Sequence, residues 1–558
     1  MSSTAKDDHA IERVAVMGAN VHKSTAHEAA AATDAEHNMG LLKSLKLYRK
    51  ACLWSIFLST CIVMEGFDNA FLASLFAFPP FQRHFGVAQP NGSYELTAAW
   101  QTGLTNGVLA GQILGLFANG IIADRFGYRK TLIGALVGCI GFIFIIFFSE
   151  TLVQLLIGEI LIGIPWGVFQ TLTTTYAAEV CPTHLRAYLT TYVNLCWVMG
   201  QFLASGVLRA MLARDDKWGY KIPFALQWIW PVPLIIGIWL APESPWWLVR
   251  RGRLEEAKRS LARLTTRNSE IPFNPDETVS MMIHTNEMEK ELLSGTSYTD
   301  LFKGANLRRT EIVCVTWMIQ TLCGATFMGY STYFYRQAGM AIENSFSMSL
   351  GQYALGAVGT VSSWFFMQWF GRRTLYLSGQ VIMCAVLLAI GCAAFAGRDN
   401  VAAQWAIGSL LLVYTFTYDA TVGPVCYSLV AELTSTRLRT KSVVLARNMY
   451  NIVGIATNII TPRMLNPTEW DWGAKSGFFW AGTCFLCAVW TFFRLPEPKG
   501  RTYGELDVLF ESGVSARKFK STVVDRIDAD SGGRESAAEK EKASLEEVMV
   551  ERAHSRPN

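Results

Sequence analysis

The chain has 558 residues, of which 51% are hydrophobic and 17% are charged, and its formal net charge is +4. Apolar runs of about 20 residues, the length that crosses a bilayer, recur along the sequence and predict a polytopic membrane protein. The net charge is small, and the basic residues are spread over short loops and do not form one patch, which argues against nucleic acid as a partner.

Twelve apolar runs are predicted to be transmembrane helices, and a long polar loop from about 242 to 310 separates them into two groups of six. In chain order they cover 52–78, 98–122, 131–149, 152–177, 189–212, 223–241, 311–334, 348–369, 375–396, 404–430, 442–465 and 474–495. The first 40 residues lack an apolar run that could serve as a cleaved signal peptide, so the first span is expected to be its own insertion signal.

The predicted spans divide the chain into five parts. Residues 1–50 are expected to form a disordered cytoplasmic N-terminus, 51–241 an N-terminal six-helix bundle and 242–310 a polar cytoplasmic linker loop. Residues 311–495 are expected to form a C-terminal six-helix bundle, and 496–558 a charged cytoplasmic tail. The fold class predicted is an all-α membrane protein.

The basic residues predict the orientation. Those in the loops after spans 2, 4, 8 and 10 are Arg125, Arg129, Lys130, Arg186, Arg372, Arg373, Arg437, Arg439 and Lys441. The positive-inside rule places these loops, and therefore both termini, in the cytoplasm. The triplet that begins at Asn91 is a glycosylation acceptor pattern in a loop that this topology places outside.

The two halves repeat each other's loop motifs. Asp124 and Arg125 open DRFGYRKT after span 2, and WFGRRT after span 8 contains Arg372 and Arg373. Seven positions separate the acidic from the basic residue in the pairs that follow spans 4 and 10, which are Glu179 with Arg186 and Glu432 with Arg439. A duplicated six-span unit is typical of transporters that rock two bundles about a central site. The repeated charges are predicted to form a cytoplasmic gate, and the alternative is that they only fix the topology.

Several of these motifs resemble the sugar porter family of the major facilitator superfamily. LIGIPWG at 161–167, followed by Tyr176, Glu179 and Arg186, is similar to that family's long signature, and PESPWWL and PEPKGRT are similar to its loop motifs. GIPWGVFQT, YVNLCWV, LCGATFMGYSTYF and ARNMYN most resemble the fungal maltose permease group. The resemblance covers about residues 50–510. It implies the major facilitator fold and symport of an α-glucoside with protons.

Glu65 and Asp68 stand three residues apart in the first span, on one face of the predicted helix. A charged side chain deep in the bilayer costs about 3 kcal/mol, so such residues are usually functional. We predict that the two carboxyls bind protons. The resemblance of Gly66-Phe67-Asp68 to the Gly-Tyr-Asp of proton-coupled sugar porters points to Asp68. The alternative is a carboxylate locked in a permanent salt bridge.

One departure from the better-known sugar symporters concerns the counter-charge. Their arginine in span 4 is replaced here by Glu159, so we predict that Arg447 in span 11 pairs with Glu65, Asp68 or Glu159. The alternative is that Arg447 extends to the cytoplasmic surface. Gln112 stands where many maltose-permease-like relatives carry an acid, which leaves open whether proton coupling is retained.

A sugar site needs amides and hydroxyls for paired hydrogen bonds and an aromatic face for the ring. The resemblance places seven residues at or beside sugar-contacting positions: Asn194, Gln320, Thr321, Thr326, Tyr427, Asn451 and Asp419. Thr321 and Thr326 replace longer amides of hexose carriers, which leaves room for a disaccharide. Tyr330 and Tyr333 could close over the ligand or serve only for packing.

The leading hypothesis is a plasma-membrane importer of an α-glucoside such as maltose, driven by protons. Two alternatives remain, namely a facilitator or exporter of a hexose, polyol or small polar metabolite, and a non-transporting sugar sensor. The chain is not expected to be an enzyme, because its polar loops offer no catalytic constellation and no phosphate-binding loop. Neither a cofactor nor a metal is expected, and ten or more of the twelve cysteines fall inside apolar runs, where we expect them to be small core residues.

Overall fold

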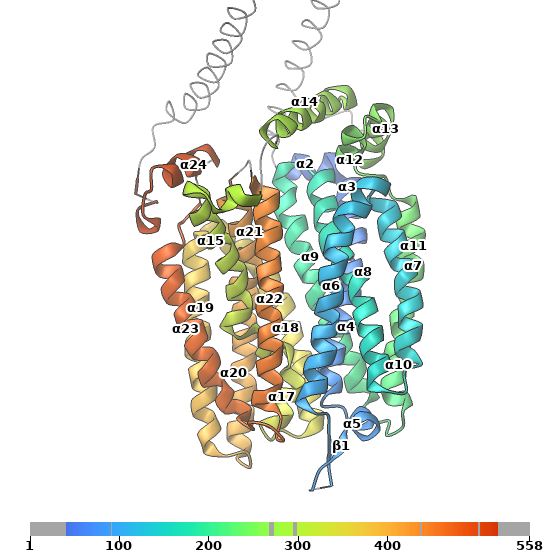
Figure 1. Cartoon of the computed structure of the whole chain (residues 1–558), viewed down its shortest axis with the longest axis vertical. Coiled ribbons are helices and arrows are strands. Elements are labelled where there is room, and N and C mark those ends of the chain that lie inside the picture. The colour runs from blue at the N-terminus through green and yellow to red at the C-terminus, as the bar shows by residue number, and fades with distance from the viewer. Residues whose placement is uncertain are drawn as a thin grey trace, which may run out of the picture.

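The computed structural model describes residues 41–90, 92–266, 273–293, 298–435, 438–499, 501, 503–519 and 521–522. Two helical bundles lie side by side, one from each half of the chain (Figure 1). This is the twelve-span, two-bundle arrangement that the sequence predicts. Within the described part, ten helical segments are long and apolar enough to cross a membrane. Two further helices, α9 and α18, are as long, with 29 and 28 residues.

The six spans of the first bundle follow the predicted order. They are α3 (Arg49–Ser59) with α4 (Cys61–Leu75), α6 (Ala98–Phe126), α7 (Tyr128–Phe147), α8 (Leu152–Val180), α9 (Thr183–Met211), and α10 (Trp218–Leu226) with η1 (Gln227–Ile229) and α11 (Pro231–Leu240). Several helices extend a few residues beyond the predicted apolar runs. An apolar run ends at the first charged residues, whereas the helix continues through them, as α6 does through Asp124 and Arg125.

The second bundle repeats this plan. Its spans are α15 (Gly304–Gln320) with η3 (Thr321–Ala325), α16 (Thr326–Gly329) and α17 (Ser331–Gln337), then α18 (Ile342–Trp369), α19 (Arg372–Ala393) with η4 (Ala394–Ala396), α20 (Val401–Ala420) with α21 (Val422–Leu433), α22 (Arg439–Leu465), and η6 (Gly473–Lys475) with α23 (Ser476–Arg494). The bundles meet mainly where α9 packs on α18 and α6 packs on α22, and smaller contacts join α4 to α16 and α17 and α9 to α21.

Two spans of the second bundle are broken near their middle. In span 7, η3 is a π-helical segment in which Gly324 has a φ of 101°, a conformation that L side chains rarely adopt. In span 10, Thr421 has φ −129° and ψ −77°, and Pro424 lacks the N–H that would continue the helical hydrogen bonds. Both breaks lie beside candidate sugar-binding residues, Thr321 in span 7 and Asp419 in span 10.

Close backbone contact holds the first bundle together. A Cβ added to Gly111 of α6 would lie 2.0 Å from the carbonyl oxygen of Ile160 in α8. Small residues of this kind allow helices in a membrane to pack at short distance, where dispersion forces stabilise them. The α6–α8 contact therefore depends on glycine and fixes the position of Gln112, the next residue.

The two ends of the molecule differ. One end, which we call the linker face, carries α2 (Leu41–Leu47), α12 (Pro245–Arg250), α13 (Leu254–Leu264), α14 (Pro275–Leu293), η2 (Tyr298–Phe302), α24 (Tyr503–Glu511) and η7 (Ala516–Lys518). The other end, the hairpin face, carries α5 (Pro79–Phe85) and strands β1 (Val87–Ala88) and β2 (Tyr94–Glu95), paired Val87 with Glu95 (Figure 1). Residues 41–50 are mostly helical, in α2 and the start of α3. The linker that we expected as a loop contains α12, α13, α14 and η2, and α15 begins within it at Gly304. The five domain boundaries stay predictions.

Candidate functional site

Glu65 of α4 is 1% exposed and accepts hydrogen bonds from two amides. Gln112 Nε2 of α6 donates to Glu65 Oε1 at 3.2 Å, and Gln170 Nε2 of α8 donates to the same oxygen. Its other carboxyl oxygen, Oε2, is buried with no hydrogen-bond partner among the described residues. Because its partners are neutral amides, this carboxyl can change its protonation state without breaking a direct ion pair.

Arg447 of α22 reaches Glu65 through an intermediate. Its guanidinium donates to Gln170 Oε1 at 2.8 Å, so the Gln170 amide lies between the carboxylate and the arginine. The guanidinium carbon also lies 4.8 Å from the ring centroid of Trp317 and 4.6 Å from that of Tyr450. These contacts hold Arg447 between the bundles and make Gln170 a polar link from the first bundle to the second.

Asp68 belongs wholly to the first bundle. It is 0% exposed, and its two carboxyl oxygens accept from Trp166 Nε1 at 3.0 Å and from Gln227 Nε2 at 2.9 Å. Glu159 is also 0% exposed, and neither of its carboxyl oxygens has a hydrogen-bond partner in the described part of the chain. The structure thus brings Arg447 to Glu65 through Gln170, whereas Asp68 has neutral donors of its own.

The sugar candidates of span 7 lie at the break in that helix. Gln320 Nε2 donates to the carbonyl oxygen of Gly423 at 2.9 Å, so its amide satisfies a backbone group beside the break in span 10. Thr326 Oγ1 donates to Thr457 Oγ1 of α22 at 3.1 Å. Thr321 is 5% exposed, and its hydroxyl has no hydrogen-bond partner among the described residues.

An aromatic cluster adjoins Arg447. The rings of Tyr427 and Tyr450 lie edge to face against Trp317, with centroids 4.9 and 5.6 Å from it. Asn451 is 1% exposed, and its amide nitrogen has no hydrogen-bond partner in the described residues. Aromatic faces beside amides of this kind suit a sugar ring.

Asn194 and Asp419 lie at the contact between α9 and α18, apart from this cluster. Asn194 Nδ2 donates to Thr360 Oγ1 of α18 at 3.5 Å, across the two bundles. Asp419 is 4% exposed and packs on α18, because a Cβ added to Gly356 would lie 2.6 Å from its Oδ2. The candidate site therefore has residues from both bundles.

The repeated loop motifs form contacts within each bundle at the linker face. In the first bundle, Glu179 pairs with Arg250 at 2.7 Å and accepts from Tyr128 Oη at 3.0 Å. Glu243 accepts from the backbone N–H of Tyr128 at 3.1 Å, and burial raises its pKa although these amide donors oppose the rise. The carbonyl of Asp124 accepts from Trp247 Nε1 at 3.0 Å.

The second bundle repeats this arrangement. Arg372 pairs with Glu432 at 3.2 Å, and Glu497 accepts from the backbone N–H groups of Arg372 and Arg373 at 2.8 and 3.1 Å. The guanidinium of Arg125, in the first bundle, lies 5.6 Å from the ring of Phe126. Three predicted residues lie outside what the structure describes: Asn91 entirely, and Arg186 and Arg439 in their side chains.

Contacts that cross between the bundles gather at the hairpin face. Seven described hydrogen bonds join span 1, its hairpin and span 2 to the second bundle: Ser74 with Thr332, Tyr330 with Thr105, Thr102 with Asn458, Asn106 with Ile455, Asn466 with Leu96, Tyr333 with Glu95, and Gln337 with Glu95. Arg209 pairs there with Glu343 at 3.8 Å. At the linker face, the described polar contact between the bundles is Gln368 with Tyr188, at 3.0 Å. The hairpin face is the closed end of this conformation.

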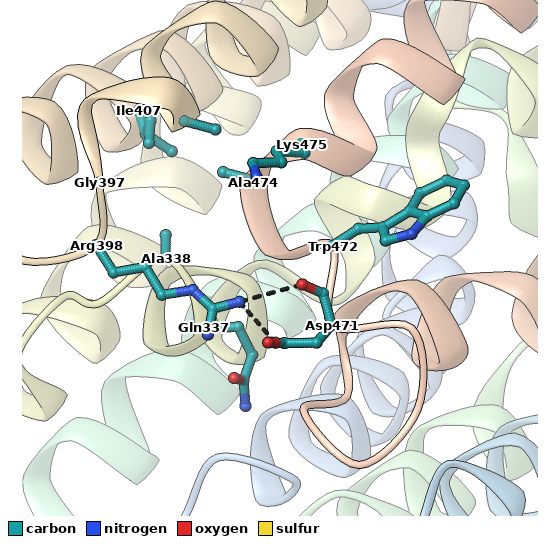
Figure 2. Close-up of a pocket in the computed structure, with 10 residues that line it drawn as sticks. Gln337, Ala338, Gly397, Arg398, Ile407, Asp471, Trp472, Ala474 and Lys475 are labelled. Carbon is teal, nitrogen blue, oxygen red and sulfur yellow. Dashed lines mark hydrogen bonds and ion pairs between the residues drawn. The ribbon is translucent and has the colours of Figure 1, made fainter.

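The cavity in Figure 2 is separate from this central site. It has a volume of about 260 Å³ and lies at the hairpin face of the second bundle, where Arg398 pairs with Asp471 at 2.6 Å (Figure 2). Gln337, Trp472 and Lys475 also line it. None of the predicted site residues does.

Sequence reasoning missed the amides and indoles that hold the carboxylates. Trp166 and Gln170 both lie in GIPWGVFQT, one helical turn apart, and contact Asp68 and Glu65. Residues three or four apart lie on one face of a helix, so Trp166 and Gln170 share a face of α8 just as Glu65 and Asp68 share a face of α4. Helical periodicity could therefore have identified them as partners of the acids. Gln227 lies in the interrupted sixth span, where no such pattern pointed to it.

The arrangement of two six-helix bundles around polar residues defines the class as a major facilitator transporter. The inward open, partially occluded xylose transporter XylE from E. coli has this fold, with a TM-score of 0.66 at 19% identity over 82% of this chain and 99% of XylE. A family model described as "Sugar (and other) transporter" matches residues 54–510, and the chain belongs to that family.

Two relatives from Saccharomyces cerevisiae are much closer in sequence. The general alpha-glucoside permease is 46% identical over 499 residues, which are 88% of this chain and 80% of the permease. The maltose permease MAL61 is 43% identical over 540 residues, which are 95% of this chain and 87% of that protein.

Proposed function

We propose that this protein imports an α-glucoside such as maltose together with protons by alternating access. The observation that carries the proposal is the link from Glu65 through Gln170 to Arg447, which ties a buried carboxyl in one bundle to a cation in the other. The names of the relatives, permeases for α-glucosides and maltose, support the substrate class.

The link suggests how a proton could act on the two bundles. With Glu65 ionised, the Gln170 amide donates to a carboxylate and accepts from a guanidinium, and each charge strengthens its hydrogen bond. When Glu65 takes a proton, the negative end of this chain is lost and the tie to Arg447 weakens. Asp68, on the same helix, is the second proton site in this proposal, and Trp166 and Gln227 keep its position.

The sugar would bind between the bundles, next to this link. Arg447, Tyr427 and Tyr450 are partly exposed there, and so is Gln170 of the first bundle. Asn194 is partly exposed at the separate contact between α9 and α18. A ring resting on the aromatic cluster could replace the protein hydrogen bonds of Gln170 and Thr326 with bonds to its hydroxyls, and it could accept from the amide nitrogen of Asn451. In this way sugar and proton would act on the same tie between the bundles.

The remaining parts of the proposal concern place and direction. We place the linker face in the cytoplasm, by the positive-inside rule, and the protein in the plasma membrane. The motifs containing Glu179 and Glu432 would then hold the cytoplasmic ends of the helices, and Asn91 would be glycosylated outside.

The experiment is transport by the purified protein in liposomes. Internal pH and labelled sugar are recorded while maltose, other disaccharides, hexoses and polyols are added one at a time, for the wild type and for Asp68→Asn. Asparagine keeps an acceptor for Gln227 but cannot bind a proton as aspartate does. We expect one class of sugar to acidify the interior, and we expect the variant to lose at least tenfold in rate.

Two outcomes would contradict the proposal. Labelled sugar moving without proton flux would make the protein a facilitator and the acids structural. Binding of sugar without any flux would favour the sensor.

A further inference from the structure

Glu95, at the end of strand β2, lies where the hairpin of the first bundle meets span 7 of the second. Its Oε2 accepts from Tyr333 Oη at 3.4 Å, and its Oε1 accepts from Gln337 Nε2 at 3.3 Å. Both donors lie on α17. Gln82 of α5 donates to Glu95 Oε2 at 3.3 Å. One carboxyl therefore gathers donors from both bundles.

The next residue strengthens the same junction. The backbone carbonyl of Leu96 accepts from Gln101 Nε2 of α6 at 3.0 Å and from Asn466 Nδ2, just after α22, at 2.8 Å. Leu96, Gln101 and Asn466 are buried. Two consecutive residues of the hairpin thus contact spans 7 and 11, so opening of the hairpin face would have to break both sets of hydrogen bonds.

We propose that Glu95 is a positioning residue for transport, which holds α17 against the hairpin and keeps the hairpin face closed while the linker face is open. The inference extends the proposed alternating access, but it does not depend on which sugar is carried. Tyr333, which the sequence suggested as a residue that could close over the ligand, takes part in this junction, whereas the seven residues predicted to contact the sugar do not.

Among the residues that the structure describes, no cation pairs directly with the Glu95 carboxyl. On α17 the titratable neighbours are Tyr333 and Arg336, and the Arg336 guanidinium donates to the carbonyl of Met340. On α5, Arg83 pairs with Asp215 at 2.7 Å and His84 with Glu150 at 3.6 Å. The neighbours from α6 and from the segment after α22 are the neutral amides of Gln101 and Asn466.

Closure of the hairpin face is therefore expected to depend on pH. Burial raises the pKa of Glu95 from 4.5 to about 7, although the donors Gln337, Tyr333 and Gln82 and the charge of Arg336 oppose the rise. A face that opens would return this carboxyl to water and to its ordinary pKa. Because the closed state binds the proton more tightly, its extra stability is complete below about pH 4.5 and is lost as the pH rises through about 7.

The test measures the opening of the hairpin face in the purified full-length protein without sugar. Spin labels are placed at two exposed positions of this face, Lys217→Cys in the first bundle and Asp399→Cys in the second, with the exposed Cys392 changed to serine. Distances between the labels are recorded from pH 5.5 to 8.5. We expect the ratio of open to closed molecules to rise on the order of tenfold over this range in the labelled parent protein.

Glu95→Gln is the decisive variant, because its side chain keeps an acceptor for α17 but cannot titrate. We expect the tenfold rise to disappear and the face to stay closed at pH 8.5. Gln337→Leu, which removes one donor, should favour the open state at every pH and retain the pH dependence. Glu343→Gln is the matched control, since it removes the exposed pair with Arg209 at the same face and should leave the pH profile unchanged.

Two results would overturn the inference. One is a pH profile of Glu95→Gln that matches the parent protein, and the other is a parent protein whose distances do not change with pH. Neither result depends on sugar transport, so the liposome experiment can succeed or fail independently.

Discussion

The two bundles make similar contacts at the linker face, but their membrane-spanning helices carry different polar residues. Glu243 in the first bundle and Glu497 in the second each follow the sixth span of their half. Each accepts from backbone N–H groups at the start of its half's third span, Tyr128 in one and Arg372 in the other. An acidic residue at a helix N-terminus accepts hydrogen bonds from N–H groups that the helix leaves unpaired, and its negative charge interacts favourably with the helix dipole.

Away from that face, the halves have separate chemistry. The first bundle contributes three buried carboxyls, Glu65, Asp68 and Glu159. The second contributes one, Asp419, together with Arg447 and its aromatic cluster. The comparison teaches that the internal repeat fixes the scaffold, while the departures from the repeat carry the proposed transport chemistry.

Removal of the tie between the bundles should give the largest effect. Arg447→Leu leaves the aromatic cluster without its cation and Gln170 without its donor, so we expect proton-coupled uptake to fall at least about a hundredfold. Gln170→Leu should cause a similar loss. Because both residues act through one hydrogen-bonded chain, the double variant should transport about as slowly as either single variant.

Initial rates of uptake in liposomes measure this coupling. Losses that multiply in the double variant would show that the two residues act independently, and the tie would then have no role. Glu256→Gln is the control. Like Arg447→Leu it removes one charge, but from an exposed pair with Arg253 at α13, so it should keep the parent rate.

The sequence predicted the scaffold well and the contacts of the site only in part. Twelve apolar runs were enough to place the spans, because the bilayer imposes length and composition on each helix. The partner of Arg447 could not be deduced in the same way. Its contact with Gln170 depends on how α22 and α8 approach each other across the two bundles, and no local pattern encodes that distance.

The break in span 7 shows the same limit. Gly324 is visible in the sequence, but its positive φ and the π-helical turn around it depend on packing against Tyr414 and Trp480. The break in span 10 was predictable, because Gly423-Pro424 interrupts a helix by its own covalent structure.

The contacts of Glu243 and Glu497 with backbone N–H groups at the linker face should give an intermediate effect. This effect is on the stability of the protein. Glu243→Ala and Glu497→Ala each leave buried or partly buried backbone N–H groups without acceptors, at a cost of about 1–3 kcal/mol. We expect both variants to unfold at lower temperature in detergent, and by similar amounts. Glu243 and Glu497 accept from equivalent backbone N–H groups at the start of the third span of their halves. A large loss in one bundle and none in the other would contradict the equivalence of the repeat.

The smallest predicted effect concerns the size of the ligand. The Thr321 side chain is buried at the start of the π-helical turn, and the longer amide of Thr321→Gln would fill space beside Gln320 and the aromatic cluster. We expect the ratio of disaccharide to hexose uptake to fall a few-fold, since the larger ligand loses room and the smaller one gains a donor. Competition between labelled maltose and glucose in one preparation measures the ratio directly. An unchanged ratio would mean that the volume at Thr321 does not select the sugar, and the selection would then lie with Tyr427 and Asn451 beside Arg447.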